Sequence, residues 1–228
     1  MDTRTIRRTS VTLPALNEPG RYLSNVTSLE GGRGRVAEFQ YADADLRDLD
    51  LADTHLVDGR ITGLKTQRTR FEKLRVDSVE FTGCGLSSLQ WTDSKLSRAV
   101  FRDCKLMGAA FEDVALDNVL FENCKLDYST LTRVRATGPV IFSKCSLREA
   151  TLAAADLGAA LIDDCDLRLT AFEGGKYRCL DLRGNDLSQL RGLASLKQIV
   201  IDQAQTLQLA EALATELDVT FGEDLDDK

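Results

Sequence analysis

Apolar residues recur along the chain with a period of five. From Val36 to Leu187 nearly every fifth residue is large and apolar, and the frame moves by one residue after Gly138. The two exceptions are Thr66 and Ala136. A smaller residue usually stands two positions earlier, and the other three positions are mostly polar, charged or glycine. This period fits neither a helix nor a strand, so it indicates internal repetition. It predicts a chain that turns a corner every five residues.

Residue chemistry also repeats at about twenty. Five cysteines at the smaller position are spaced by 20, 20, 21 and 20 residues: Cys84, Cys104, Cys124, Cys145 and Cys165. Four phenylalanines keep the same spacing on a neighbouring face: Phe81, Phe101, Phe121 and Phe142. Four units of five would therefore form one coil. Because the single extra residue leaves both series in register, we expect a local bulge at a corner rather than a register slip.

Several units have the form of a known repeat. Ala44-Asp45-Leu46, Ala155-Asp156-Leu157 and Cys165-Asp166-Leu167 are examples. On these residues the chain resembles the pentapeptide-repeat family, and the resemblance covers about two thirds of its length. It implies an all-β fold, a right-handed quadrilateral parallel β-helix of about seven to eight coils. At a strand spacing of ~4.8 Å this solenoid would be roughly 35 Å long. Each coil buries its core only against its neighbours, so both ends need caps.

The pattern divides the chain into four segments. Residues 1–35 lack the period and contain Pro14 and Pro19, so we expect a capping or partly disordered N-terminal segment. Residues 36–189 form the β-helix, residues 190–221 a strand and helix module, and residues 222–228 an acidic tail.

The C-terminal module is expected to contain a helix of about four turns. Asp202 and Gln205 have the spacing of a capping box at its start. One apolar stripe follows, formed by Ala204, Leu207, Ala210, Leu213, Ala214 and Leu217. Two interpretations are open. The stripe covers the last coil, or, as the resemblance implies, it forms a homodimer contact through Leu207, Ala210, Leu213 and Leu217.

The sequence contains few residues that indicate catalysis, a metal site or a cofactor site. The ladder cysteines are expected to be reduced core residues, and Cys179 is the one thiol at an outward position. His55 is expected at the surface, and it is the only histidine. With no Cys-x-x-Cys pair, phosphate-binding loop or nucleophile turn, we expect no enzyme activity, no cofactor and no metal. No apolar run is long enough to span a membrane, and the start lacks an apolar signal region, so we expect a cytoplasmic protein.

Acidic residues are concentrated in particular segments. The net charge is −7, but residues 211–228 alone carry seven acids and one base. Within the repeats an acidic first coil precedes a basic belt from Arg60 to Arg75, and acids return later. The candidate partner-binding acidic surface consists of Asp43, Asp45, Asp48, Asp53, Asp58, Asp163, Asp164 and Asp166. Outward apolar residues form a second candidate contact surface: Val57, Val100, Met107, Leu120, Leu161 and Leu169.

The predicted function is therefore a rigid, non-catalytic scaffold for a protein partner. The resemblance implies one specific form, in which the rod imitates duplex DNA, binds DNA gyrase or a related topoisomerase, and protects it from quinolones. Such a mimic needs an acidic face. The alternative is a structural or assembly module that docks an unidentified protein without acting on gyrase. Direct nucleic-acid binding by the basic belt is disfavoured, because outward aromatic residues for base stacking are lacking.

Overall fold

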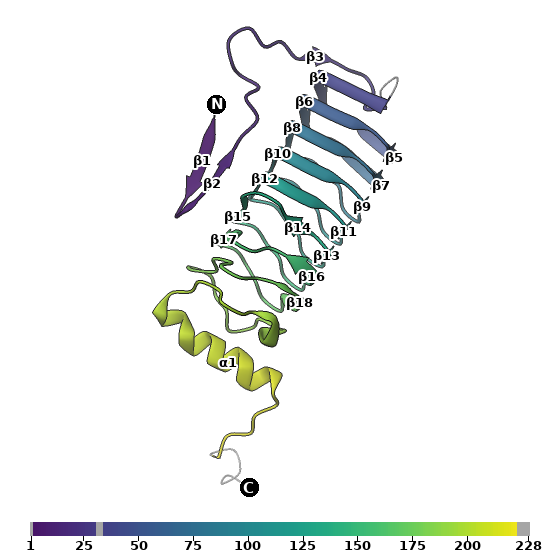
Figure 1. Cartoon of the computed structure of the whole chain (residues 1–228). Coiled ribbons are helices and arrows are strands. Elements are labelled where there is room, and N and C mark those ends of the chain that lie inside the picture. Colours follow the sequence, from purple (N-terminus) through teal and green to yellow (C-terminus); the bar gives the residue numbers. More distant parts are fainter. Residues whose placement is uncertain (1, 31–33, 223–228) are drawn as a thin grey trace.

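The computed structural model describes residues 2–30 and 34–222. It is a parallel β-solenoid of about seven turns with one helix beyond its last coil (Figure 1). The predicted fold class is confirmed. The large apolar residues of the five-residue frame point inward and form one continuous core along the solenoid.

The strands lie in columns along the solenoid. The first column contains strands of eight residues: β4 (Arg35–Ala42), β6 (His55–Thr62), β8 (Arg75–Thr82), β10 (Lys95–Arg102) and β12 (Ala115–Glu122). The opposite column contains β5 (Asp45–Ala52), β7 (Lys65–Glu72), β9 (Gln90–Thr92), β11 (Ala110–Glu112) and β13 (Thr130–Thr132). The later coils contain β14 (Arg135–Ala136), β15 (Val140–Ser143), β16 (Thr151–Asp156), β17 (Leu161–Asp163) and β18 (Ala171–Lys176).

Strand register confirms the coil of twenty residues and the bulge. Phe81 pairs with Phe101, Phe101 with Phe121, and Phe121 with Phe142 across the extra residue. At the insertion the backbone N–H groups of Thr137 and Gly138 both donate to the carbonyl of Leu116, at 2.8 and 3.3 Å. The extra residue is thus absorbed at one corner, and the core residues beyond it stay inside.

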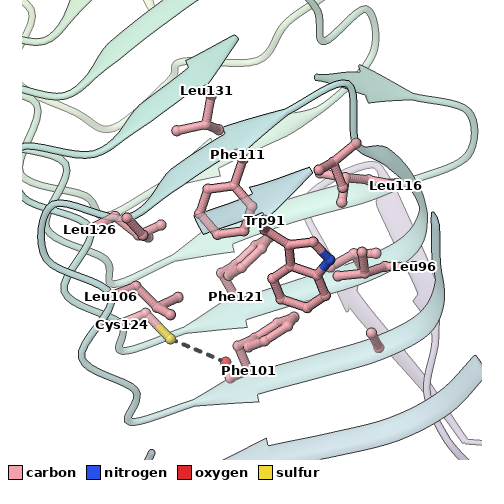
Figure 2. Close-up of a cluster of buried hydrophobic side chains, with 14 of the residues drawn as sticks. Trp91, Leu96, Phe101, Leu106, Phe111, Leu116, Phe121, Cys124, Leu126 and Leu131 are labelled. Atoms are coloured by element: carbon pink, nitrogen blue, oxygen red, sulfur yellow. Dashed lines mark hydrogen bonds between the residues drawn. The ribbon is translucent and has the colours of Figure 1, made fainter. Parts of the chain in front are cut away.

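Like side chains stack inside the solenoid. Successive ring centroids in the phenylalanine column are 4.6, 4.8 and 4.8 Å apart, and the rings are nearly parallel. Figure 2 shows this interior, with Trp91 among the phenylalanines and leucines and the Cys124 thiol pointing to the carbonyl of Phe101. The spacing follows from the ~4.8 Å between strands. Each coil is therefore stabilised mainly by the coils directly above and below it.

Corners place one residue of each unit in the left-handed region. Two residues after the large apolar residue, Asp43, Asp53 and Asp103 have φ values of 52°, 48° and 56°. Aspartate and asparagine tolerate this conformation better than most residues. The polar residues of the repeat therefore shape the corners as well as keep the surface soluble.

The N-terminal segment forms a β-hairpin beside the solenoid. β1 (Thr3–Ile6) and β2 (Thr9–Thr12) pair antiparallel, and β3 (Ser24–Asn25) then joins the first coil parallel to β4. Figure 1 shows the hairpin alongside the strands of the first column and the helix at the opposite end from β3. The hairpin thus lies against one side of the rod, and the chain returns to the first coil.

The C-terminal end consists of two 3-10 turns and a helix. They are η2 (Leu193–Ser195), η3 (Gln203–Gln205) and α1 (Thr206–Glu216). The capping box of Asp202 and Gln205 is present, as expected. The regular helix has 11 residues, shorter than the four turns predicted from the sequence. Val200 forms a single bridge to Asp181.

Candidate protein-docking surfaces

Buried cysteines form a hydrogen-bonded column in the core. Each ladder thiol lies near a backbone carbonyl of the preceding coil, for example Cys104 to Phe81 at 3.4 Å and Cys145 to Phe121 at 3.4 Å. Contacts with neighbouring thiols, together with burial, raise the pKa of Cys84, Cys124 and Cys145. All six cysteines are free, and Cys179 alone is exposed. The ladder is therefore a packing element, and Cys179 is the thiol exposed to solvent.

His55 lies in a column of cations at one corner of the rod. It pairs in register with Arg35 on one side and Arg75 on the other. Partial burial and the charge of Arg35 lower its pKa. Over residues 2–30 and 34–222 no cluster of three or more histidine, cysteine or acidic side chains is arranged to hold a metal ion. This environment favours the neutral imidazole, against an opposing effect of Asp77.

The eight acids of the candidate surface fall into two groups at opposite ends of the solenoid. Asp45 and Asp166 stand in one column, joined in register through Lys65, Gly85, Lys105, Lys125 and Ser146. Six strand spacings separate the two aspartates, or about 29 Å. The acids therefore do not form one continuous face.

Basic residues of the second coil stand in register beside acids of the first coil. Asp45 pairs in register with Lys65, Asp48 with Arg68 and Asp50 with Arg70. The same arrangement recurs as cross-coil ion pairs: Arg60 to Glu80 at 3.0 Å, Arg102 to Glu122 at 2.9 Å and Arg133 to Asp113 at 2.8 Å. Exposed pairs of this kind contribute about 0–1 kcal/mol each. The charge bands of the sequence thus place opposite charges on neighbouring coils.

Three of the candidate acids are held by arginines. Asp58 contacts Arg21 at 2.7 Å, and Asp163 accepts a hydrogen bond from Arg7 at 2.7 Å. Arg168 binds Asp166 and lowers the pKa of that carboxyl. Asp48 has only long contacts, at 3.9 Å to Arg47 and 4.0 Å to Arg68. Within the described chain the exposed and unpaired members are Asp43, Asp45, Asp53 and Asp164.

Helix α1 covers the last coil with polar groups. The Gln205 side-chain amide donates to the carbonyls of Leu182 and Asn185 at 3.0 and 2.7 Å. The Gln208 side chain accepts from the N–H of Leu187 at 3.1 Å, and Ala212 is the buried residue of the helix. These bonds satisfy backbone groups that have no further coil to pair with.

The predicted apolar stripe of the helix faces solvent. Leu207, Leu213 and Leu217 are 68%, 44% and 64% exposed, and Ala210 is exposed as well. The interpretation that this stripe covers the last coil is therefore wrong. Val219 and Phe221, at 47% and 56% exposed, extend the apolar surface beyond the helix. The free face is available for a partner.

The N-terminal hairpin covers another apolar surface, which the sequence indicated only in part. Val11 of the hairpin forms one buried cluster with outward residues of four successive coils: Val100, Leu120, Ile141 and Leu161. Three of these were among the outward apolar candidates, and Ile141 was not. Their spacing of 20, 21 and 20 residues is the coil period, and this signal could have identified them as one surface. This contact surface is therefore already occupied within the chain.

The geometry defines a class of protein, a four-sided parallel β-solenoid whose candidate sites are surfaces. Residues 76–138 match the family model described as a pentapeptide repeat region. These residues form a pentapeptide repeat region, and the five-residue frame continues on both sides of them. No curated protein matches it. No helix of the described residues is long and apolar enough to cross a membrane.

Solved structures of similar fold share little sequence with this chain. A trypsin-treated variant of QnrB1, a plasmid-mediated fluoroquinolone resistance protein, is 14% identical over 75% of this chain and 98% of its own, with a TM-score of 0.43. HetL, involved in heterocyst differentiation regulation in Nostoc sp. strain PCC 7120, is 18% identical over 73% and 86%, with a TM-score of 0.29. Rfr23 from Cyanothece 51142 is 16% identical over 54% and 91%, with a TM-score of 0.29.

Proposed function

We propose that this chain is a non-catalytic rod that binds a protein partner and forms a homodimer through α1. The observation on which this rests is the exposed apolar face of the helix, formed by Leu207, Leu213 and Leu217 beyond the last coil. Exposed apolar patches on soluble proteins commonly mark interaction sites. A second copy fits because the same face on both chains forms a closed two-fold contact, which is the commonest symmetry of soluble oligomers. Two rods would then meet end to end.

The most specific form of this function is binding to DNA gyrase as a mimic of DNA. It rests on the family resemblance and on the four unpaired acids, Asp43, Asp45, Asp53 and Asp164. Pairing through α1 would bring the two Asp164 residues towards the middle of the dimer and place the first-coil acids at its outer ends. A DNA-binding groove is lined with cations that attract such carboxylates.

The alternative is an assembly module that docks another protein without acting on gyrase. The cross-coil ion pairs favour it, because they neutralise much of the surface that a mimic would present as phosphate charge. The pairs Arg60–Glu80 and Arg102–Glu122, at 3.0 and 2.9 Å, are the main examples. A partner recognised by shape and apolar contact would not require a continuous acidic face.

A supercoiling assay with purified gyrase, with and without a fluoroquinolone, separates the two forms. The mimic predicts inhibition of supercoiling or protection from the drug. It also predicts loss of that effect when Asp43→Asn, Asp45→Asn and Asp53→Asn are combined. The matched control is Asp113→Asn, which removes an acid already paired with Arg133 and is expected to retain the effect. No effect of the wild-type protein on gyrase would leave the assembly module, to be pursued by capture of the partner.

A further inference from the structure

The side of the solenoid beneath the hairpin is apolar where a solvated surface would be polar. Val100, Leu120, Ile141 and Leu161 stand in one outward column and pair in register from coil to coil. We call these four residues the side stripe. Earlier in the same column the residues are Gln40, Arg60 and Glu80. The column therefore changes from polar to apolar where the hairpin begins to cover it.

The hairpin complements the side stripe in shape and charge. Val11 is 0% exposed on the stripe, with Ile6 and Leu13 packed beside it. At the edges, the N–H of Thr12 donates to Asn118 Oδ1 at 2.8 Å and Arg7 binds Asp163 at 2.7 Å. Arg4 contacts Glu122 at 3.4 Å. A basic hairpin with one apolar face thus fits an apolar stripe with acidic edges.

The hairpin is joined to the solenoid by a connection that can act as a hinge. Residues 17–22 are all exposed and contain no strand or helix, and they contact the solenoid through Asn17 with Arg60 at 3.1 Å and Arg21 with Asp58 at 2.7 Å. The two strands of the hairpin pair only with each other among the described strands. A two-stranded hairpin is marginally stable alone, so its order depends on the stripe. A cleft of about 880 Å³ lined by Arg8, Thr9 and Cys179 lies between the hairpin turn and the last coils. Because the hairpin strands do not join the solenoid sheet, side-chain contacts hold the hairpin in place.

We propose that the hairpin is an exchangeable arm and that the side stripe accepts the hairpin of a second copy of this chain. Every hairpin contact described above would be remade between the two copies, while the linker contacts of Asn17 with Arg60 and of Arg21 with Asp58 would rearrange. Exchange of an identical element between protomers is a low-cost route to dimers. Within one chain the arm is held at an effective concentration of about millimolar, so the closed monomeric form dominates at micromolar protein.

This interface lies on the side of the rod, separate from the exposed face of α1, and the inference goes beyond the proposed function. The argument for a second copy is that no other described segment is shown to match the stripe in both apolar contact and charge. Crowding of chains, or loss of the arm's own site, would shift the arm from its own stripe to that of a neighbour.

The test uses two full-length variants that are each unable to close. Val11→Asp disrupts the apolar face of the arm and leaves the side stripe intact. Leu120→Asp disrupts the side stripe and leaves the arm intact. Both positions lie outside the solenoid interior, so each Asp reaches water once the arm is released. Both proteins also carry Leu207→Asp and Leu213→Asp, so that association through α1 does not contribute.

Light scattering after size-exclusion chromatography is expected to show one-chain masses for each variant and a two-chain complex in their mixture. As a control, a protein with both Val11→Asp and Leu120→Asp should not associate with the Val11→Asp protein. A monomeric mixture with native circular dichroism would overturn the proposal, as would equal complex formation with the control.

A charge exchange provides a second test should either Asp variant unfold. Arg7→Asp and Asp163→Arg, each combined with Leu207→Asp and Leu213→Asp, place like charges in contact within one chain. In a mixture, both exchanged interfaces regain an opposite pair. Preferential formation of the mixed dimer over either self-dimer supports arm exchange, and equal populations of monomer in all three samples contradict it.

Discussion

Leu126 offers a direct test of the five-residue frame. Its side chain is 0% exposed, in the leucine column that includes Leu106 and Leu147. Leu126→Ala should cost about 2–5 kcal/mol of unfolding free energy through lost burial and the cavity left behind. Leu126→Asp adds a buried carboxylate without a cation, and we expect a loss above about 4 kcal/mol. Because a domain has only ~5–15 kcal/mol in total, this change should unfold the central coils or bring them close to unfolding.

The assay is urea unfolding followed by circular dichroism, with Tyr128→Asp as the matched control. Tyr128 is 54% exposed and has a φ of 60°, a conformation that aspartate tolerates. The control midpoint should stay close to that of the wild-type protein. An unchanged midpoint for Leu126→Asp would show that this position faces solvent and would refute the inward assignment of the frame.

Three further changes have outcomes set by the structure. Gly59→Ala should destabilise the first coils, because an added Cβ would lie 2.1 Å from the Phe39 ring, and a lowered unfolding midpoint is the expected result. A thiol reagent should modify one cysteine rapidly, Cys179, and the other five only on denaturation; fast reaction of two or more thiols in the native protein would contradict the core ladder. The pKa of His55 is lowered in the fold, so the unfolded chain binds the proton more tightly and stability should fall as the pH drops through and below 6.5; His55→Gln should weaken this dependence in pH-dependent urea titrations.

The repeat region could be predicted from sequence because every coil repeats the same constraint. One inward position per five residues, and one cysteine or phenylalanine per coil, set both the corner spacing and the register. Even the insertion at Gly138 could be placed, because Phe121 and Phe142 keep the same column across it. In this fold the residues that produce the local five-residue period are also the residues that stack from coil to coil.

The ends of the rod could not be predicted in this way. The last coil presents carbonyl and N–H groups with no further strand, so it is covered by Gln205 and Gln208 rather than by the apolar stripe of the helix. The period of the apolar residues carries no information about these unpaired backbone groups. The hairpin was missed for a different reason: Ile6 and Val11 lie outside the repeat, and their partners look like scattered surface residues until they are compared at the coil period.

The central claim is that the rod pairs through the exposed face of α1. Sedimentation equilibrium at micromolar concentration tests it most directly, on the wild-type protein and on the variant with Leu207→Asp and Leu213→Asp. The account predicts a mass of two chains for the wild type and one chain for the variant, with identical circular dichroism. A one-chain mass for the wild type, or a two-chain mass that persists in the variant, would contradict it.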